Sequence, residues 1–174
     1  MMQDLDVLLL RVAAGGLLAA HGAQKLFGAF EGPGMKGTAG MMEHLGLKPP
    51  MAWAVAAAGG EFGGGMLTVL GLFHPLGSIG AISAMSMAIG KVHLGKPIWV
   101  SQGGAELPLL YLSAALAVGL AGPGKYSLDE ALDLHMPAAL SAVLAVGAGA
   151  TLAYGLAAQP PVRNQEQQGA QPAA

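Results

Sequence analysis

Residues 51–73 read MAWAVAAAGGEFGGGMLTVLGLF, an apolar run with one carboxylate, Glu61, near its centre. A helix needs roughly 20 apolar residues to cross the hydrocarbon core of a bilayer, so this run predicts a membrane-spanning helix. It is not a phosphate-binding loop, because no Lys-Ser or Lys-Thr pair follows the glycines. A carboxylate near mid-membrane costs roughly 2.5–3.5 kcal/mol or more. We therefore expect Glu61 to face a partner or a hydrated cavity.

The glycines of this run are spaced for helix packing. Gly59 with Gly63, and Gly60 with Gly64, are four residues apart, which places each pair on one helix face. Small residues at that spacing allow neighbouring helices to approach closely, so we expect both pairs to lie at helix contacts.

The composition of the whole chain supports a membrane protein. Of 174 residues, 53% are hydrophobic and only 10% are charged, whereas soluble domains carry about 25% charged residues. The net charge of −2 argues against binding to nucleic acid. Cysteine is absent, which excludes disulfides, thiol catalysis and cysteine-ligated clusters within this chain.

Five stretches approach the length of a membrane span, which predicts an all-α, polytopic transmembrane helix bundle. They are Leu5 to Phe27, Met51 to Phe73, Leu76 to Leu94, Ala105 to Ala121 and Met136 to Ala157. The acidic N-terminus, MMQDLD, lacks the positive charge of a secretory signal, so the first span is predicted to be a retained anchor. The tail, residues 159–174, is rich in Gln, Pro and Ala and is predicted to be disordered.

The loop between the first two spans is predicted to contain a short helix of its own. Thr38 is its expected cap, and Met41, Met42 and Leu45 form an apolar stripe before Gly46. Such a helix would lie on the bilayer surface. An ordinary ordered loop is the alternative.

The polar residues of the first span suggest an intramembrane ion pair. Arg11 and Lys25 share a helix face, with His21 close beside it. Counted from opposite membrane faces at about 1.5 Å per residue, Arg11 and Glu61 differ in height by only a few ångströms. We therefore predict an Arg11–Glu61 ion pair. In the alternative, Arg11 extends to the membrane surface and Glu61 is protonated.

The remaining polar residues converge on one membrane face. The first and third spans end where the second and fourth begin, so their polar ends form a vestibule above Glu61. Its predicted members are His21, Gln24, Lys25, Lys91, His93, Gln102 and Glu106. Two histidines with carboxylates could also bind a metal, but no local motif such as HExxH supports this, and we predict no metal site.

Several stretches resemble the DoxX family of small bacterial membrane proteins. They are LLLRVAAGGLLAAHGAQKLFGAFEGPGMKGTAG, GGEFGGGMLTVLG, KVH, GGAELPLLYL and GPGKYSLDE, within residues 8–130. The segment HGAQKLFG, followed by GPG and GTAG, is the most specific. One departure is Ala105, where the family often has an aromatic residue before Glu106. The family-like polar residues are Arg11, His21, Gln24, Lys25, Glu61, His93 and Glu106.

The resemblance implies a four-helix membrane core, which we assign to residues 1–130, with an additional transmembrane helix in residues 131–158. It also implies a multi-pass protein of the bacterial inner membrane and a redox association, since the family name derives from a thiosulfate:quinone oxidoreductase subunit. The first hypothesis is therefore an accessory subunit of a quinone- or sulfur-linked redox complex.

In this hypothesis the polar cluster binds a quinone head group or small anion. The chain has no flavin, haem or iron–sulfur motif, so electrons would come from a membrane or redox protein partner. The alternatives are a non-catalytic scaffold or assembly factor, whose polar cluster is structural, and a small transporter. Whether the chain is an enzyme stays open. The distribution of lysines predicts that the N-terminus faces out and the tail faces in.

Overall fold

The computed structural model describes residues 2–158, and every regular element within them is helical. The five predicted helices are all present. The first is a continuous rod of α1 (Met2–Leu10), a π-helical turn (Arg11–Gly15) and α2 (Gly16–Phe27). The second is α4 (Pro50–Leu70) and the third is α5 (Leu76–Ala88), which continues into a π-helical turn (Ile89–His93). The fourth is α6 (Glu106–Ala121) and the fifth is α8 (Ala138–Ala157). The tail predicted to be disordered lies outside the described residues.

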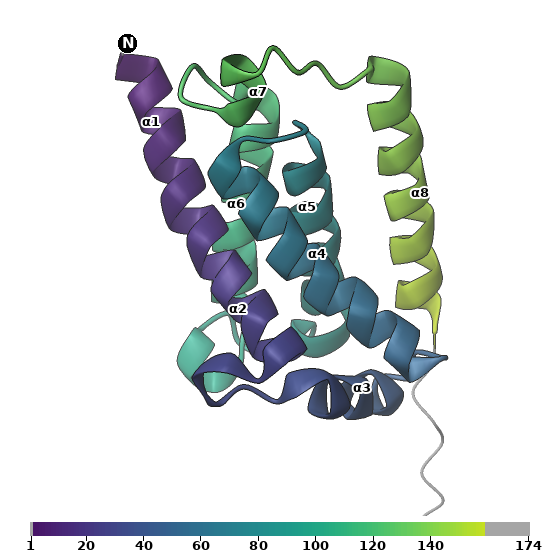
Figure 1. Cartoon of the computed structure of the whole chain (residues 1–174). Coiled ribbons are helices and arrows are strands. Elements are labelled where there is room, and N and C mark those ends of the chain that lie inside the picture. The colour runs from purple at the N-terminus through teal and green to yellow at the C-terminus, as the bar shows by residue number, and fades with distance from the viewer. Residues whose placement is uncertain (1, 159–174) are drawn as a thin grey trace, which may run out of the picture.

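The long helices form a bundle whose connections gather at its two ends (Figure 1). At one end α3 (Gly34–His44) lies across the bundle, and the 3-10 turns Ala29–Glu31 and Val100–Gln102 lie at the same end. At the opposite end lie the N-terminus of α1 and the short helix α7 (Leu128–Ala131). The last helix, α8, stands at the edge of the bundle and packs against α5.

Glycine and proline set the ends of the central helix. Pro50 occupies the first turn of α4, where its missing N–H leaves no hydrogen bond unmade. Gly71 ends the helix with a φ of 60°, and its N–H bonds to the carbonyl of Thr68. A residue with a side chain would be strained in this left-handed conformation. The chain therefore turns sharply towards α5.

Glycines also allow α4 to lie very close to both of its neighbours. An added Cβ on Gly65 would lie 2.5 Å from the backbone nitrogen of Ala19 on α2. An added Cβ on Gly64 would lie 3.1 Å from the carbonyl oxygen of Gly77 on α5. The prediction of glycine-mediated packing is thus confirmed for the face that bears Gly60 and Gly64.

The same prediction is wrong for Gly59 and Gly63. An added Cβ on either glycine would meet nothing within 4 Å. The spacing of four residues places the two glycines on one face, but that face points away from the neighbouring helices. Periodicity alone does not say which of two glycine faces meets a partner.

The predicted helix in the first loop is present as α3, but its cap is different. Thr38 lies inside the helix and is fully buried, and its hydroxyl donates to the carbonyls of Gly34 at 2.8 Å and Lys25 at 3.3 Å. Pro33 precedes the helix instead. Met42, on the predicted apolar stripe, is buried with Leu47 and Ala54 of the chain leading into and through α4. Thr38 therefore ties α3 to the end of α2.

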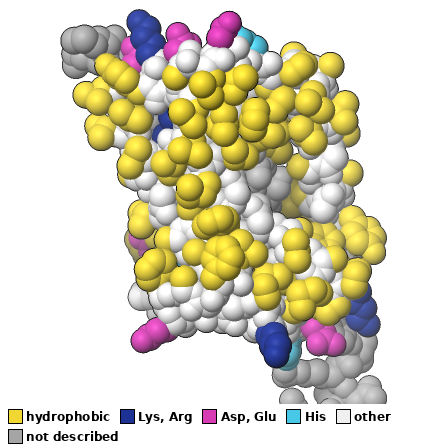
Figure 2. All heavy atoms as spheres, in the orientation of Figure 1, with side chains coloured by type: hydrophobic (Ala, Val, Ile, Leu, Met, Phe, Trp, Pro, Cys, Tyr) yellow, Lys and Arg dark blue, Asp and Glu magenta, His cyan; other side chains and the backbone are white. Residues whose placement is uncertain are grey.

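Among residues 2–158, two helices are long and apolar enough to cross a membrane by length and composition, Asp4–Phe27 and Ala138–Ala157. Glu106–Ala121 is a shorter apolar helix. Helix α4 has sufficient length, but five glycines and Glu61 reduce its apolar character. On the face seen in Figure 2, charged side chains gather at the two ends and a mainly hydrophobic band lies between them. This distribution is the one expected for a protein surrounded by lipid.

Candidate functional site

The central feature of the site is a buried ion pair between α2 and α4. Glu61 is 3% exposed, and its Oε1 accepts a hydrogen bond from the ammonium group of Lys25. The contact depends on Gly22, one turn before Lys25, because an added Cβ there would lie 2.2 Å from the backbone nitrogen of Phe62. Close approach of the two helices brings the lysine side chain to the carboxylate.

The second carboxylate oxygen of Glu61 is different. Oε2 is buried and has no hydrogen-bond partner among the described residues. An ionised carboxylate offers about four acceptor positions on its two oxygens, so the bond to Lys25 leaves most of that capacity unused. A buried acceptor in this state can receive a hydrogen bond from a bound molecule.

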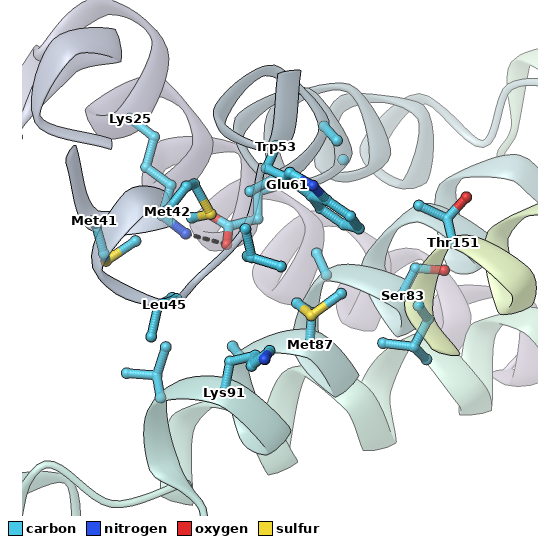
Figure 3. A pocket seen from close by; sticks show the side chains of 18 of the residues that line it. Lys25, Met41, Met42, Leu45, Trp53, Glu61, Ser83, Met87, Lys91 and Thr151 are labelled. Carbon is cyan, nitrogen blue, oxygen red and sulfur yellow. Dashed lines mark hydrogen bonds and ion pairs between the residues drawn. The ribbon is translucent and has the colours of Figure 1, made fainter. Parts of the chain in front are cut away.

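A cavity of about 400 Å³ lies beside this pair, between α3, α4, α5 and α8. In Figure 3 the ion pair lies towards one side of it, and Ser83 and Thr151 lie on the other. Most of its wall is apolar. The apolar lining includes Met41, Met42, Leu45, Leu47, Trp53, Ala57, Ala84, Met87 and Leu152. The volume falls within the range of about 300–1,000 Å³ that is common for small-molecule sites.

A second cavity of about 190 Å³ lies on the other side of the ion pair, towards α6. Lys25, Glu61, Ala88 and His93 line both cavities. The second cavity is also lined by His21 and by several residues of the α5–α6 region, among them Val100, Pro108 and Tyr111. The ion pair therefore lies between a large apolar cavity and a smaller one. His93 lines both cavities, whereas His21 lines only the smaller.

The histidines of the predicted vestibule are held by neighbouring groups. His21 packs edge-on against Tyr111 with 5.8 Å between ring centroids, and its Nδ1 lies 3.2 Å from Oε1 of Gln24. His93 Nδ1 donates to the carbonyl of Gly103 at 2.7 Å, since a carbonyl can only accept. Both rings are thus positioned at the rim of the smaller cavity.

The other predicted members of the vestibule have different places. Lys91 lines the large cavity, and its ammonium group donates to the carbonyl of Ala158 just beyond α8. Glu106 caps the preceding turn, because its Oε2 accepts from the backbone nitrogen of Val100 at 2.8 Å. Gln102 is exposed in that turn, and neither it nor Gln24 lines the two cavities described above.

The predicted Arg11–Glu61 ion pair is wrong. Arg11 is 1% exposed and donates to the carbonyls of Thr68 at 2.9 Å and Val69 at 2.8 Å. It also donates to the carbonyls of Pro123 and Tyr126 in the loop before α7. The last carbonyls of a helix have no partner within it. The guanidinium group donates to two such carbonyls of α4, those of Thr68 and Val69, and the Thr68 carbonyl also accepts from Gly71. Arg11 therefore fastens the end of the bundle that lies away from Glu61.

A carboxylate completes the polar cluster at that opposite end. Asp129, on α7, accepts from the backbone nitrogens of Phe73 at 2.8 Å and His74 at 2.7 Å. Burial lowers the pKa of His74 below its ordinary value of 6.5, and the negative charge of Asp129 opposes this shift in part. These contacts hold the turn between α4 and α5.

Sequence reasoning missed most of the cavity wall. Trp53, Met87 and Tyr111 are apolar or aromatic residues within predicted spans, where such residues are common and do not indicate a site. Only the folded structure shows their role, because it brings together residues far apart in the sequence. Trp53 of α4, for example, stacks on Tyr154 of α8 with 6.2 Å between ring centroids. Within residues 2–158, no three histidine or acidic side chains lie close enough together to hold a metal ion.

Comparison with known proteins identifies the family. No curated protein and no solved structure matches this chain. The DoxX family model matches residues 7–94, which include α2, α4 and α5, and with them Lys25, Glu61 and His93. Because this match covers half of the 174 residues, the protein belongs to the DoxX family.

Proposed function

We propose that this DoxX protein binds a lipophilic quinone-type molecule beside the Lys25–Glu61 pair, as an accessory subunit of a redox-linked complex in the bacterial inner membrane. The proposed topology is a four-helix transmembrane core, α1–α2, α4, α5 and α6, with α8 as a fifth span. The apolar helices and the family membership indicate a membrane protein. The accessory role and the ligand are the proposed steps.

The observation that carries this proposal is the composition of the large cavity. A wall of methionine, alanine and leucine side chains surrounds about 400 Å³, and the polar Lys25–Glu61 pair stands at one side. Sites for lipophilic ligands combine an apolar lining with a few polar groups that fix orientation. The ring of a quinone would lie at the ion pair, and its tail would follow the apolar wall towards α8.

The position of α8 supports the entry of such a ligand from the lipid. Ala148, Thr151 and Leu152 of α8 form one wall of the cavity. Only 6% of the apolar window of this helix is buried within the protein. A ligand dissolved in the bilayer would therefore reach the cavity beside a helix that the bundle holds by one face.

A scaffold or assembly role is the second candidate. It is favoured by the outer face of α8, where Val143 and Val146 are about two-thirds or more exposed. Such a face could pack against another membrane protein. In this case the Lys25–Glu61 pair would serve only to join α2 to α4.

The test is to purify the protein in mild detergent and to identify extracted small molecules by mass spectrometry. We expect a quinone to be retained, and we expect Ala57→Leu, which fills the cavity, to lose it. The matched control is Ala52→Leu, at an exposed position of the same helix. Retention of no quinone by the folded wild-type protein, or equal retention by both variants, would reject the ligand site and favour the scaffold.

A further inference from the structure

Glu61 lines the large cavity, so its hydrogen-bonding state bears on which ligand this cavity selects. Oε1 is bonded to Lys25, whereas Oε2 is buried without a hydrogen-bond partner in the described part of the chain. Leaving a buried acceptor unpaired is costly, and a bond to a charged acceptor is stronger than one between neutral groups. A ligand that donates a hydrogen bond at this point would remove that cost.

Lys91 and His93, which also line the large cavity, do not fill this role. Lys91 donates to the carbonyl of Ala158, and His93 Nδ1 donates to the carbonyl of Gly103. The Lys25 side chain is 24% exposed, so its remaining N–H groups are less enclosed than Glu61 Oε2. Glu61, by contrast, has a side chain that is 4% exposed. The unmet requirement at the ion pair is therefore for a donor rather than an acceptor.

The charges around the cavity restrict what the donor can be. Lys25 and Lys91 both line it, which disfavours a cationic head group such as an amine. An ionised anionic head group would place a second negative charge against Glu61 Oε2 and would bring no donor to it. The apolar wall requires a lipophilic body. A neutral molecule with an O–H group meets all of these conditions.

We propose that the cavity selects a neutral lipophilic ligand that donates an O–H to Glu61 Oε2, so that it binds a hydroquinone more tightly than the matching quinone. This inference rests on the proposed function, since it specifies the form of the same ligand. A quinone ring presents only carbonyl acceptors, which cannot pair with Oε2. Its hydroquinone has the same carbon skeleton and carries two O–H donors.

The experiment compares three molecules that share one skeleton. Dissociation constants are measured for a decyl-substituted benzoquinone, its hydroquinone kept reduced under anaerobic conditions, and the dimethyl ether of that hydroquinone. The full chain in lipid nanodiscs is used. One charge-assisted hydrogen bond predicts about 10- to 100-fold tighter binding of the hydroquinone than of the other two.

The outcomes separate this inference from the proposed function. Equal or tighter binding of the quinone or the ether overturns the selection of a donor but leaves a quinone site in place. Binding of none of the three to the folded protein overturns both. A decyl alcohol that binds as tightly as the hydroquinone would show that the hydroxyl group alone is recognised, and would overturn the assignment to a hydroquinone.

A variant of Glu61 provides a second readout. Glu61→Gln replaces one carboxylate oxygen by an amide nitrogen, which donates rather than accepts. We expect the ratio of quinone to hydroquinone dissociation constants to fall by about tenfold or more in this variant. An unchanged ratio in a folded variant overturns the inference, and the wild-type comparison decides the matter if the variant does not fold.

Discussion

Replacing Gly22 by alanine tests whether the contact between α2 and α4 holds the site together. An added Cβ would lie 2.2 Å from the backbone nitrogen and 2.5 Å from the Cα of Phe62. Overpacking costs about 1–3 kcal/mol, and we expect the upper end because a helix backbone cannot move aside as a side chain can. Gly63→Ala is the matched control on α4, since its Cβ would meet nothing within 4 Å.

The two variants should therefore differ clearly. Gly63→Ala should be neutral, or stabilising by up to about 1 kcal/mol, because alanine favours helix more than glycine does. A difference of about 3 kcal/mol between the variants corresponds to about 6–12 °C in melting temperature for a chain of this size. Circular dichroism in detergent measures the melting, and mass spectrometry measures the retained quinone. Displacement of α2 should also separate Lys25 from Glu61 and reduce retention.

Two results would contradict this reasoning. If Gly22→Ala melted at the same temperature as Gly63→Ala, the close approach of the helices at Phe62 would not exist. If Gly22→Ala were destabilised but retained its ligand fully, the helix contact would be real, but it would not position the ion pair for binding.

Three further predictions concern other parts of the bundle. Arg11→Lys should lower the free energy of unfolding by about 1–3 kcal/mol or more, measured by thermal melting, because lysine cannot reproduce the planar donor geometry that serves four carbonyls. Gly155→Val should move α8 outward, because its Cβ would lie 2.2 Å from Met87 and 2.8 Å from the ring of Trp53. Quinone retention, measured by mass spectrometry, should then fall about tenfold. The control Gly149→Val, where an added Cβ meets nothing within 4 Å, should retain the ligand. The pKa of His74 is lowered in the folded state, so the unfolded chain binds protons more readily. The free energy of unfolding should therefore be at its full value above about pH 6.5 and should fall as the pH decreases below it. His74→Gln should flatten the profile of melting temperature between about pH 5 and 8.

The sequence predicted the helices of this protein well because apolar length is a local property. All five predicted helices are present. Convergence of His21, Lys25, Lys91 and His93 near Glu61 was also predictable, because alternating helices bring the ends of the first and third next to each other. Antiparallel connectivity alone determines that arrangement.

The partner of Glu61 was not predictable from heights in the membrane. The estimate that paired it with Arg11 assumed that both helices stand upright, whereas α4 crosses the bundle obliquely (Figure 1). A tilted helix brings a residue closer to the membrane face than a count of residues indicates. Gly22, which allows the approach of α2, has no glycine four residues away, whereas Gly63, where an added Cβ would meet nothing within 4 Å, does.

Arg11 and Lys25 lie far apart on the first helix, and the two parts of this helix have different roles. Fourteen residues at about 1.5 Å each place the two cations about 21 Å apart along the rod. Each of the three guanidinium nitrogens of Arg11 donates to a backbone carbonyl, and the side chain is fully buried. Lys25 bonds to one carboxylate oxygen and leaves the other without a partner, with a cavity on each side. A cation whose nitrogens are all hydrogen-bonded stabilises a fold, whereas an ion pair with one unpartnered oxygen beside an apolar cavity is suited to binding a ligand. The chemistry of this protein is therefore expected at the α3 end of the bundle, and its mechanical anchorage at the other.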